Sequence, residues 1–210
     1  MIFELDDLDV RFPPAELAEE DGLLAVGGDL TPQRLINAYQ NGIFPWYSDD
    51  SPILWYSPHE RFVLFPEKIR ISKSMRQTLR SGKFRVTTDT AFKEVIKACA
   101  AKERKDQDGT WITSEMQEAY IHLHEIGIAH SVEVWEDDQL VGGLYGISSG
   151  RAFCGESMFS HVSNASKIAL IWLCHTSAYE LIDCQIYSEH LATLGAEMLS
   201  RDLFLPYLIS

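Results

Sequence analysis

The sequence predicts an α+β fold in which a small N-terminal α/β part packs on a larger C-terminal domain. Hydrophobic residues make up 46% of the 210 residues and charged residues 23%, which is typical of a globular chain with a substantial core. In the second half, three consecutive segments have strand character, and a helical pattern and another strand follow them. Aromatic and proline-broken segments concentrate before residue 62, so we divide the chain into residues 1–61 and 62–210.

The N-terminal part is predicted to contain one clear helix. Residues 1–30 have the composition of a loop. Thr31 is then a candidate N-cap with a proline at the first helical position, and Gly42 ends the helix. The segments 42–47 and 53–58 are aromatic and interrupted by proline, which predicts loops or edge strands.

Short strands and helices alternate in the middle of the chain. Residues 61–65 and 84–88 have strand composition, and a helix is predicted between them over 72–80. Asp89 is a candidate cap of the next helix, and the Ser-Glu-Met-Gln sequence that begins at Ser114 fits the capping box of another. These helices would cover the sheet of the larger domain.

The C-terminal third has the clearest pattern. Strands are predicted over 130–135, 139–147 and 151–159, because short turn sequences separate segments rich in β-branched and aromatic residues. A helix over 164–179, a buried strand over 181–187 and two short helices complete the chain. This order predicts an antiparallel meander that continues into a helix and a further strand.

The net charge hides an uneven distribution. A formal charge of −13 argues against a general nucleic-acid coat, because a uniformly acidic surface repels phosphates. Residues 68–88, however, contain seven basic residues and no acidic one, which leaves −20 for the rest. Lys73, Arg76 and Arg80 fall on one face of the predicted helix, which favours contact with phosphates. An ordinary solvated face, paired with acidic residues elsewhere, is the alternative.

Three polar residues lie toward the ends of predicted strands in the C-terminal domain. Glu156 is near the end of the third strand, and alternation places Asp183 and Gln185 on one face of the strand over 181–187. A carboxylate and an amide two residues apart could position an incoming amine and accept its proton. A polar network that merely fixes the sheet is an equal alternative, because buried polar groups need partners in any case.

Five aromatic residues are unusually dense in predicted loops. They could stack on bases or cover a ligand, although filling the space between two domains is the more common role. These residues are Trp46, Tyr47, Trp55, Tyr56 and Trp111.

No motif indicates a metal, a nucleotide cofactor or a membrane. The chain has no Walker-type phosphate loop, and its glycine-rich segment 142–146 lies inside a strand pattern. The N-terminus lacks the basic and apolar regions of a signal peptide, and the longest apolar run, 168–174, is too short to span a bilayer. We therefore expect a cytoplasmic protein without metal or cofactor.

In its longer motifs the chain resembles the leucyl/phenylalanyl-tRNA–protein transferases, which are bacterial aminoacyltransferases of the N-degron pathway. The similarity runs from about residue 20 to residue 208. Its most distinctive motifs are Phe-Pro-Trp at 44–46, Cys-Gly-Glu-Ser-Met-Phe at 154–159 and Ile-Asp-Cys-Gln at 182–185.

The resemblance implies a fold and an activity. The C-terminal domain would have the acetyltransferase-like (GNAT) fold, without the pyrophosphate loop that binds acetyl-CoA. The enzyme would move Leu or Phe, and Met less well, from aminoacyl-tRNA to proteins with N-terminal Arg or Lys, and so mark them for degradation. No cofactor is implied, and we expect a monomer.

The resemblance also assigns roles to particular residues. Asp183 would orient Gln185, which contacts the attacking amine, and Glu156 would assist nearby. Three further sets of residues are implied: a donor side-chain pocket of Leu144, Leu170, Leu173 and Ile182, an adenosine contact at Trp46 and Trp111, and a tRNA contact at Lys73, Arg76, Arg80 and Lys83.

Other functions remain as alternatives at this point. An acetyl-CoA-dependent acetyltransferase would share the fold, and a peptidoglycan-type aminoacyltransferase would share the donor. A non-enzymatic tRNA-binding module would explain the basic helix but not the motifs around Glu156 and Gln185.

Overall fold

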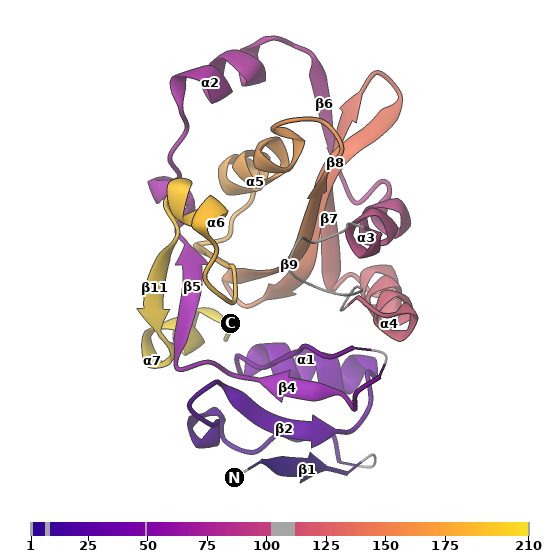
Figure 1. Cartoon of the computed structure of the whole chain (residues 1–210), viewed down its shortest axis with the longest axis vertical. Coiled ribbons are helices and arrows are strands. Elements are labelled where there is room, and N and C mark those ends of the chain that lie inside the picture. The colour runs from indigo at the N-terminus through magenta and orange to yellow at the C-terminus, as the bar shows by residue number, and fades with distance from the viewer. Residues whose placement is uncertain (1, 7–8, 49, 102–111, 210) are drawn as a thin grey trace.

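The computed structural model describes residues 2–6, 9–48, 50–101 and 112–209 and contains two β-sheets (Figure 1). The smaller sheet has the strand order β1-β2-β4-β3. The larger sheet has the order β11-β5-β10-β9-β8-β7-β6. The predicted α+β class, with a small N-terminal part beside a larger domain, is therefore confirmed.

The N-terminal part contains more strands than its sequence suggests. The strand β1 pairs in parallel with β2, which in turn pairs in antiparallel fashion with β4. The prediction of a loop over 1–30 is thus wrong. The sequence did not reveal these strands, because each is short and depends on pairing with a distant segment. The elements are β1 (Phe3–Leu5), η1 (Ala15–Leu17), β2 (Leu23–Gly27), α1 (Pro32–Gln40), β3 (Phe44–Pro45) and β4 (Leu54–Tyr56).

The large sheet contains the predicted meander. The strands β7, β8 and β9 pair in antiparallel order, and α5 (Ala165–Thr176) then carries the chain to β10, which pairs in parallel with β9. This is the strand-strand-strand-helix-strand order that the sequence predicts. The strands are β5 (Glu60–Leu64), β6 (Phe84–Thr88), β7 (Ala129–Glu136), β8 (Gln139–Ser149), β9 (Ala152–Ser160), β10 (Leu181–Asp183) and β11 (Glu197–Ser200).

Helices cover both faces of the large sheet. The helix α5 lies on one face, and α3 (Phe92–Ala100) and α4 (Ser114–Glu125) lie on the other (Figure 1). Neighbouring residues of β5 serve different faces, since Val63 packs in one core cluster and Leu64 in the other. The remaining helical elements are η2 (Pro66–Lys68), α2 (Lys73–Arg80), α6 (Glu189–Thr193), α7 (Arg201–Phe204) and η3 (Leu205–Tyr207).

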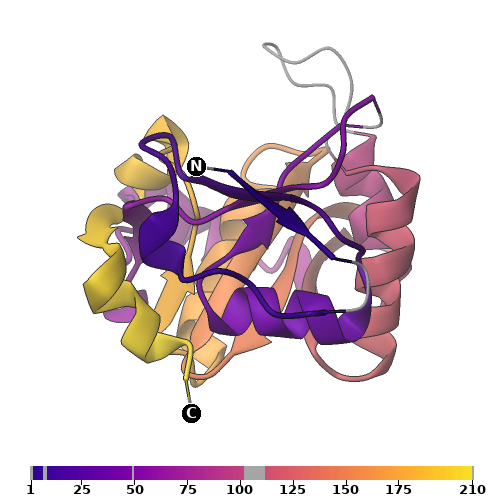
Figure 2. The same ribbon diagram turned by 90° about the horizontal axis from the view of Figure 1, so that it is seen from below.

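The N-terminal sheet and α1 lie across one end of the large sheet (Figure 2). The strand β5 belongs to the large sheet but begins at Glu60, so the chain enters the larger domain close to the predicted boundary. The division into residues 1–61 and 62–210 stays a prediction.

Several predicted helix and strand ends are shifted. Thr113, not Ser114, caps α4, because its hydroxyl accepts the amide of Met116 at 3.1 Å. Asp89 does not cap α3, whose N-cap is Ala91. The backbone of Asp89 is left-handed, and the carboxylate of Asp89 accepts a hydrogen bond from the amide of Ser131 instead. Local capping patterns do not reveal this pairing with a distant strand.

The C-terminal segment differs in three further places. The helix after Asn164 ends at Thr176 and not at residue 179. The strand expected over 181–187 ends at Asp183, and β11 forms between the two short helices. The apolar residues after Asp183 do not continue the strand. Their side chains line a cavity. Within the described residues, no helix is long and apolar enough to cross a membrane.

A glycine in β8 tests the packing of the meander. A Cβ at Gly146 would lie 2.3 Å from the carbonyl oxygen of Cys154, whereas a Cβ at Gly155 would meet its nearest atom at 3.4 Å. We expect Gly146→Ala to lower the free energy of unfolding by about 1–3 kcal/mol, because backbone must move. Urea unfolding measures this, with Gly155→Ala as the matched control. Equal stability of the two variants would contradict the packing described here.

Candidate active site

The predicted catalytic residues meet where β10 ends. Gln185 follows β10 in a left-handed conformation with φ of 64°. Its backbone amide donates to Asp183 Oδ1 at 2.8 Å, and its carbonyl accepts the amide of Phe62 at 3.2 Å. Asp183 therefore fixes the turn through the backbone of Gln185, and not through two side chains on one strand face as the sequence suggested.

Glu156 lies beside Gln185 and receives hydrogen bonds from three elements. The side-chain amide of Gln185 donates to Glu156 Oε1 at 2.7 Å. Tyr39 on α1 donates to the same oxygen at 2.6 Å, and Tyr120 on α4 donates to Oε2 at 3.3 Å. The two tyrosine hydroxyls also lie within hydrogen-bond distance of each other, but each has a single hydrogen, so both donate to the carboxylate only when neither donates to the other. A buried carboxylate is thus held by neutral donors.

Sequence reasoning did not identify Tyr39 and Tyr120 as site residues. Each lies on the apolar face of its helix and is fully or almost fully buried, so each was indistinguishable from a core aromatic residue. The available signal was the hydroxyl, because a buried tyrosine needs a hydrogen-bond partner. Which partner it has depends on tertiary contacts more than 30 residues away.

The environment of Glu156 changes its acidity. Burial raises the pKa of this carboxyl to about 7, the hydrogen bonds from Tyr39 and Gln185 oppose the shift, and the nearby charge of Asp183 adds to it. Burial likewise raises the pKa of both tyrosine hydroxyls well above the ordinary value. Glu156 can therefore exchange a proton near neutral pH, whereas the tyrosines remain donors.

Asp183 is paired with a buried arginine. Arg61 on β5 forms a two-pronged contact with it, in which Nη2 faces Oδ2 and Nε lies 3.2 Å from Oδ1. The remaining arm of the guanidinium, Nη1, donates to the carbonyl of Gly42 at 2.8 Å. Sequence reasoning missed Arg61, although a charged residue beside the apolar run of β5 was a usable signal.

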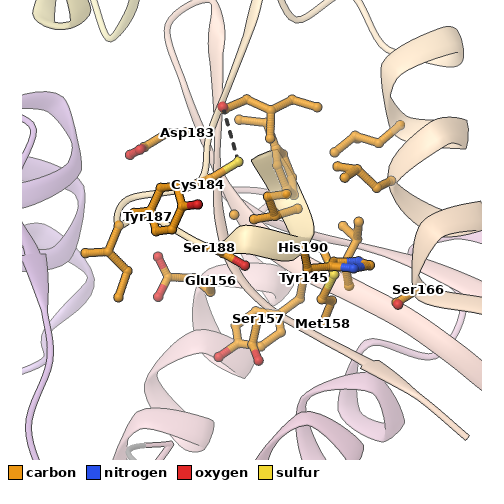
Figure 3. Close-up of a pocket in the computed structure, with 18 residues that line it drawn as sticks. Tyr145, Glu156, Ser157, Met158, Ser166, Asp183, Cys184, Tyr187, Ser188 and His190 are labelled. Carbon is orange, nitrogen blue, oxygen red and sulfur yellow. Dashed lines mark hydrogen bonds between the residues drawn. The ribbon is translucent and has the colours of Figure 1, made fainter. Parts of the chain in front are cut away.

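The four predicted donor-pocket residues all line one cavity of about 450 Å³. They are Leu144, Leu170, Leu173 and Ile182. Glu156 and Asp183 lie on one side of this cavity and Ser166 of α5 lies across from them (Figure 3). Phe153, Met158 and Tyr187 add apolar surface, so the cavity suits an apolar group with a polar end toward Glu156.

A second, smaller cavity adjoins the first. It measures about 120 Å³ and is lined by Trp46, Glu156, Gln185 and neighbouring residues. Because Glu156 lines both cavities, it lies between them. Trp46 itself packs against Tyr56, with ring centroids 5.8 Å apart. The other predicted adenosine contact, Trp111, lies outside the described residues.

The predicted tRNA contacts divide into free and paired cations. Lys73, Arg76 and Arg80 are exposed on α2, and none of them has a carboxylate partner within the described part of the chain. Lys83 lies just before β6 and pairs with Glu136 at 3.1 Å. The helix α2 lies at the end of the molecule opposite the N-terminal sheet (Figure 1).

Among described residues no cluster of three or more His, Cys, Asp or Glu could hold a metal.

The raised pKa of Glu156 makes stability depend on pH. Its pKa of about 7 in the folded protein lies above the ordinary glutamate value of 4.5, so its contribution to stability is fully present below pH 4.5 and is lost as pH rises through 7. Relative to Glu156→Gln, the wild type should lose up to about 3 kcal/mol of unfolding free energy over that window. Urea unfolding of both proteins across pH measures this difference, and parallel curves would contradict the assignment.

The chain was compared with family models and with solved structures. Two sequence models match, namely "Leucyl/phenylalanyl-tRNA protein transferase" over residues 63–209 and the N-terminal domain of the same family over residues 28–59. A GCN5-related N-acetyltransferase from Kribbella flavida is similar in structure, with a TM-score of 0.39 and 7% identity over 79% of this chain and 60% of that one.

Two curated relatives are similar over nearly the whole chain. A leucyl/phenylalanyl-tRNA–protein transferase of Syntrophus aciditrophicus is 61% identical over 198 residues, which cover 93% of this chain and 83% of the relative. One from Christiangramia forsetii is 55% identical and covers 95% of this chain and 96% of the relative. The chain therefore belongs to the leucyl/phenylalanyl-tRNA–protein transferase family.

Proposed function

We propose that this enzyme transfers Leu or Phe, and Met less well, from aminoacyl-tRNA to the α-amino group of proteins with N-terminal Arg or Lys, which marks them for degradation. Family membership supports the reaction. The observation that carries it is the hydrogen-bonded pair of Glu156 and Gln185 beside two adjoining cavities, one apolar and one with Trp46 in its wall.

The apolar cavity suits the donor's side chain. Leucine and phenylalanine side chains would contact Leu144, Leu170, Leu173 and Ile182, while the ester carbonyl faces Glu156. A β-branched side chain would fit less well, because branching widens it next to the ester. Choice between Leu and Phe rests on the fit of a few carbon atoms, which decides about 1–3 kcal/mol for each methylene.

The smaller cavity suits the end of the tRNA. The 3′ adenosine would lie against the ring of Trp46, because stacking on an aromatic face does not require a particular base. With the side chain in one cavity and the adenosine in the other, the ester bond that joins them would lie next to Glu156 and Gln185. The reacting atoms and the polar residues then share one place.

The chemical step needs positioning and the transfer of one proton. The acceptor's α-amine attacks the ester carbonyl, a new amide bond forms, and the C–O bond to the tRNA breaks. Gln185 would accept a hydrogen bond from the amine with Oε1, while its Nε2 donates to Glu156. Glutamine is not a base at neutral pH, so the proton that the amine loses reaches the departing 3′ oxygen either directly or by way of Glu156.

The body of the tRNA would be bound through phosphates. Lys73, Arg76 and Arg80 project from α2 without carboxylate partners among the described residues, and Lys83 lies one turn beyond. These contacts predict salt-sensitive binding with little dependence on tRNA sequence. We further propose that the enzyme acts in the cytoplasm as a monomer.

One assay separates the proposed reaction from its alternatives. Labelled Leu-tRNA and a peptide that begins with Arg or Lys should yield a Leu-extended peptide, and the N-acetylated peptide should yield none, because its amine is blocked. Acetyl-CoA should neither bind nor serve as a donor. Transfer from acetyl-CoA, or to a cell-wall precursor in place of the peptide, would overturn the proposal.

Replacing the polar residues should slow transfer without releasing the tRNA. We expect Gln185→Ala and Glu156→Gln each to lower the single-turnover rate by about 100-fold, the lower end of what a positioned proton-transfer group contributes. Glu133→Gln is the matched control, because Glu133 is also buried and hydrogen-bonded, to Thr87 and Ser131, away from both cavities. Wild-type rates in Gln185→Ala and Glu156→Gln would contradict these roles.

The basic helix can be tested by the dependence of binding on salt. Arg76→Ala should weaken binding of Leu-tRNA and lower the slope of log affinity against log salt by about one, as loss of one phosphate contact does. Lys97→Ala on α3 is the control, since this lysine is exposed on a different face of the sheet. Fluorescence anisotropy at several salt concentrations gives both slopes, and an unchanged slope for Arg76→Ala would exclude the contact.

A further inference from the structure

We propose that Arg61 is a positioning residue for the transfer reaction, because its guanidinium locks Asp183 in the place from which Asp183 holds Gln185 toward Glu156. This inference rests on the proposed function. Arg61 touches neither cavity directly. It would act through Asp183 on one side and through Gly42 on the other.

The surroundings of the guanidinium leave it little freedom. Its side chain is 1% exposed, and three of its nitrogens donate to Asp183 and to the carbonyl of Gly42. Its central carbon lies 4.8 Å from the ring centroid of Phe44 and 4.7 Å from that of Phe204. A planar group held at its edge by acceptors and packed against aromatic rings cannot rotate without losing several contacts.

The link from Arg61 to Gln185 runs through one oxygen atom. Asp183 Oδ1 accepts both Nε of Arg61 at 3.2 Å and the backbone amide of Gln185 at 2.8 Å. Gln185 has a positive φ, which residues other than glycine seldom adopt. The hydrogen bond from its amide to Asp183 therefore stabilises a disfavoured turn. This turn directs Nε2 of Gln185 toward Glu156.

The third arm of Arg61 binds the backbone just before a segment that lines the smaller cavity. Gly42, whose carbonyl it binds, immediately precedes the segment that contains Phe44 and Trp46. The same guanidinium therefore joins β5, the end of β10 and the beginning of the Trp46 segment. Trp46 is also held independently, because its amide donates to the carbonyl of Leu54 at 2.9 Å. Loss of Arg61 should consequently disturb Gln185 more than Trp46.

Lysine is the informative replacement for Arg61. It keeps the positive charge beside Asp183 but cannot reach three acceptors with a planar fork. We expect Arg61→Lys to lower the single-turnover rate constant about 100-fold at saturating Leu-tRNA and Arg-peptide, as a misplaced reacting group does. Affinity for Leu-tRNA should stay within about threefold, because phosphate contacts dominate it.

A purely structural role would give a different result. It would lower the fraction of active molecules and the melting temperature, but each folded molecule would react at the wild-type rate. Arg34→Lys supplies this comparison, because Arg34 is also fully buried and binds Asp29 and the carbonyls of Asp6 and Asp9, away from both cavities. We expect this control to lose stability and keep its rate constant.

The outcomes separate the inference from the proposed function. Failure of the wild type to transfer Leu would overturn the function, whereas a wild-type rate constant in folded Arg61→Lys would overturn only the positioning role. If Arg61→Lys does not fold, Arg61→Gln/Asp183→Asn replaces it, because this pair leaves no unpaired buried charge. Its rate constant is compared with that of Asp183→Asn alone, because loss of the Asp183 carboxylate by itself also releases Gln185. Equal losses in the two variants support a role of Arg61 through Asp183, whereas a larger loss in the double variant, or wild-type transfer by it, contradicts the inference.

Discussion

The site depends on one buried ion pair. Arg61 and Asp183 are both withdrawn from water, and such charges are tolerated only when geometry and further hydrogen bonds compensate their desolvation. Here the compensation comes from Gly42, from the backbone of Gln185 and from two aromatic rings. Because these partners belong to the N-terminal part, the end of β10 and the C-terminal α7, the pair joins segments that are far apart in the sequence.

Two carboxylates in this site have different surroundings and therefore different uses. Asp183 faces a cation and serves to hold a turn. Glu156 faces only neutral donors among its hydrogen-bond partners, and burial raises its pKa to about 7. Two carboxyl groups in one site can take different roles when their environments differ. The hydroxyls of Tyr39 and Tyr120 hydrogen-bond to Glu156 without supplying charge, and they only partly oppose the rise in pKa that burial causes.

The sequence predicted what depends on local order. The meander of β7, β8 and β9 follows from segments of strand composition and the turn residues between them, and Glu156 and Gln185 stand in extended motifs. It could not predict what depends on distant partners. Tyr39 and Glu156 are 117 residues apart, Arg61 and Asp183 are 122 apart, and β1 and β11 are short edge strands. The apolar residues after Asp183 suggested a longer strand, because a left-handed Gln185 leaves no local signal.

The arrangement of charge is consistent with the two proposed substrates. The cations of α2 have no carboxylate partners among the described residues and could meet the phosphates of the proposed tRNA, while the acidic groups at the candidate site are buried and hydrogen-bonded. A free carboxylate at the reacting centre would repel the tRNA end and would hold the acceptor's amine in its protonated, unreactive form. Pairing with Arg61 offsets the charge of Asp183, and a pKa of about 7 leaves Glu156 partly protonated at neutral pH, so both effects are reduced. The net charge of −13 is thus compatible with an RNA substrate, because position decides which charges the RNA meets.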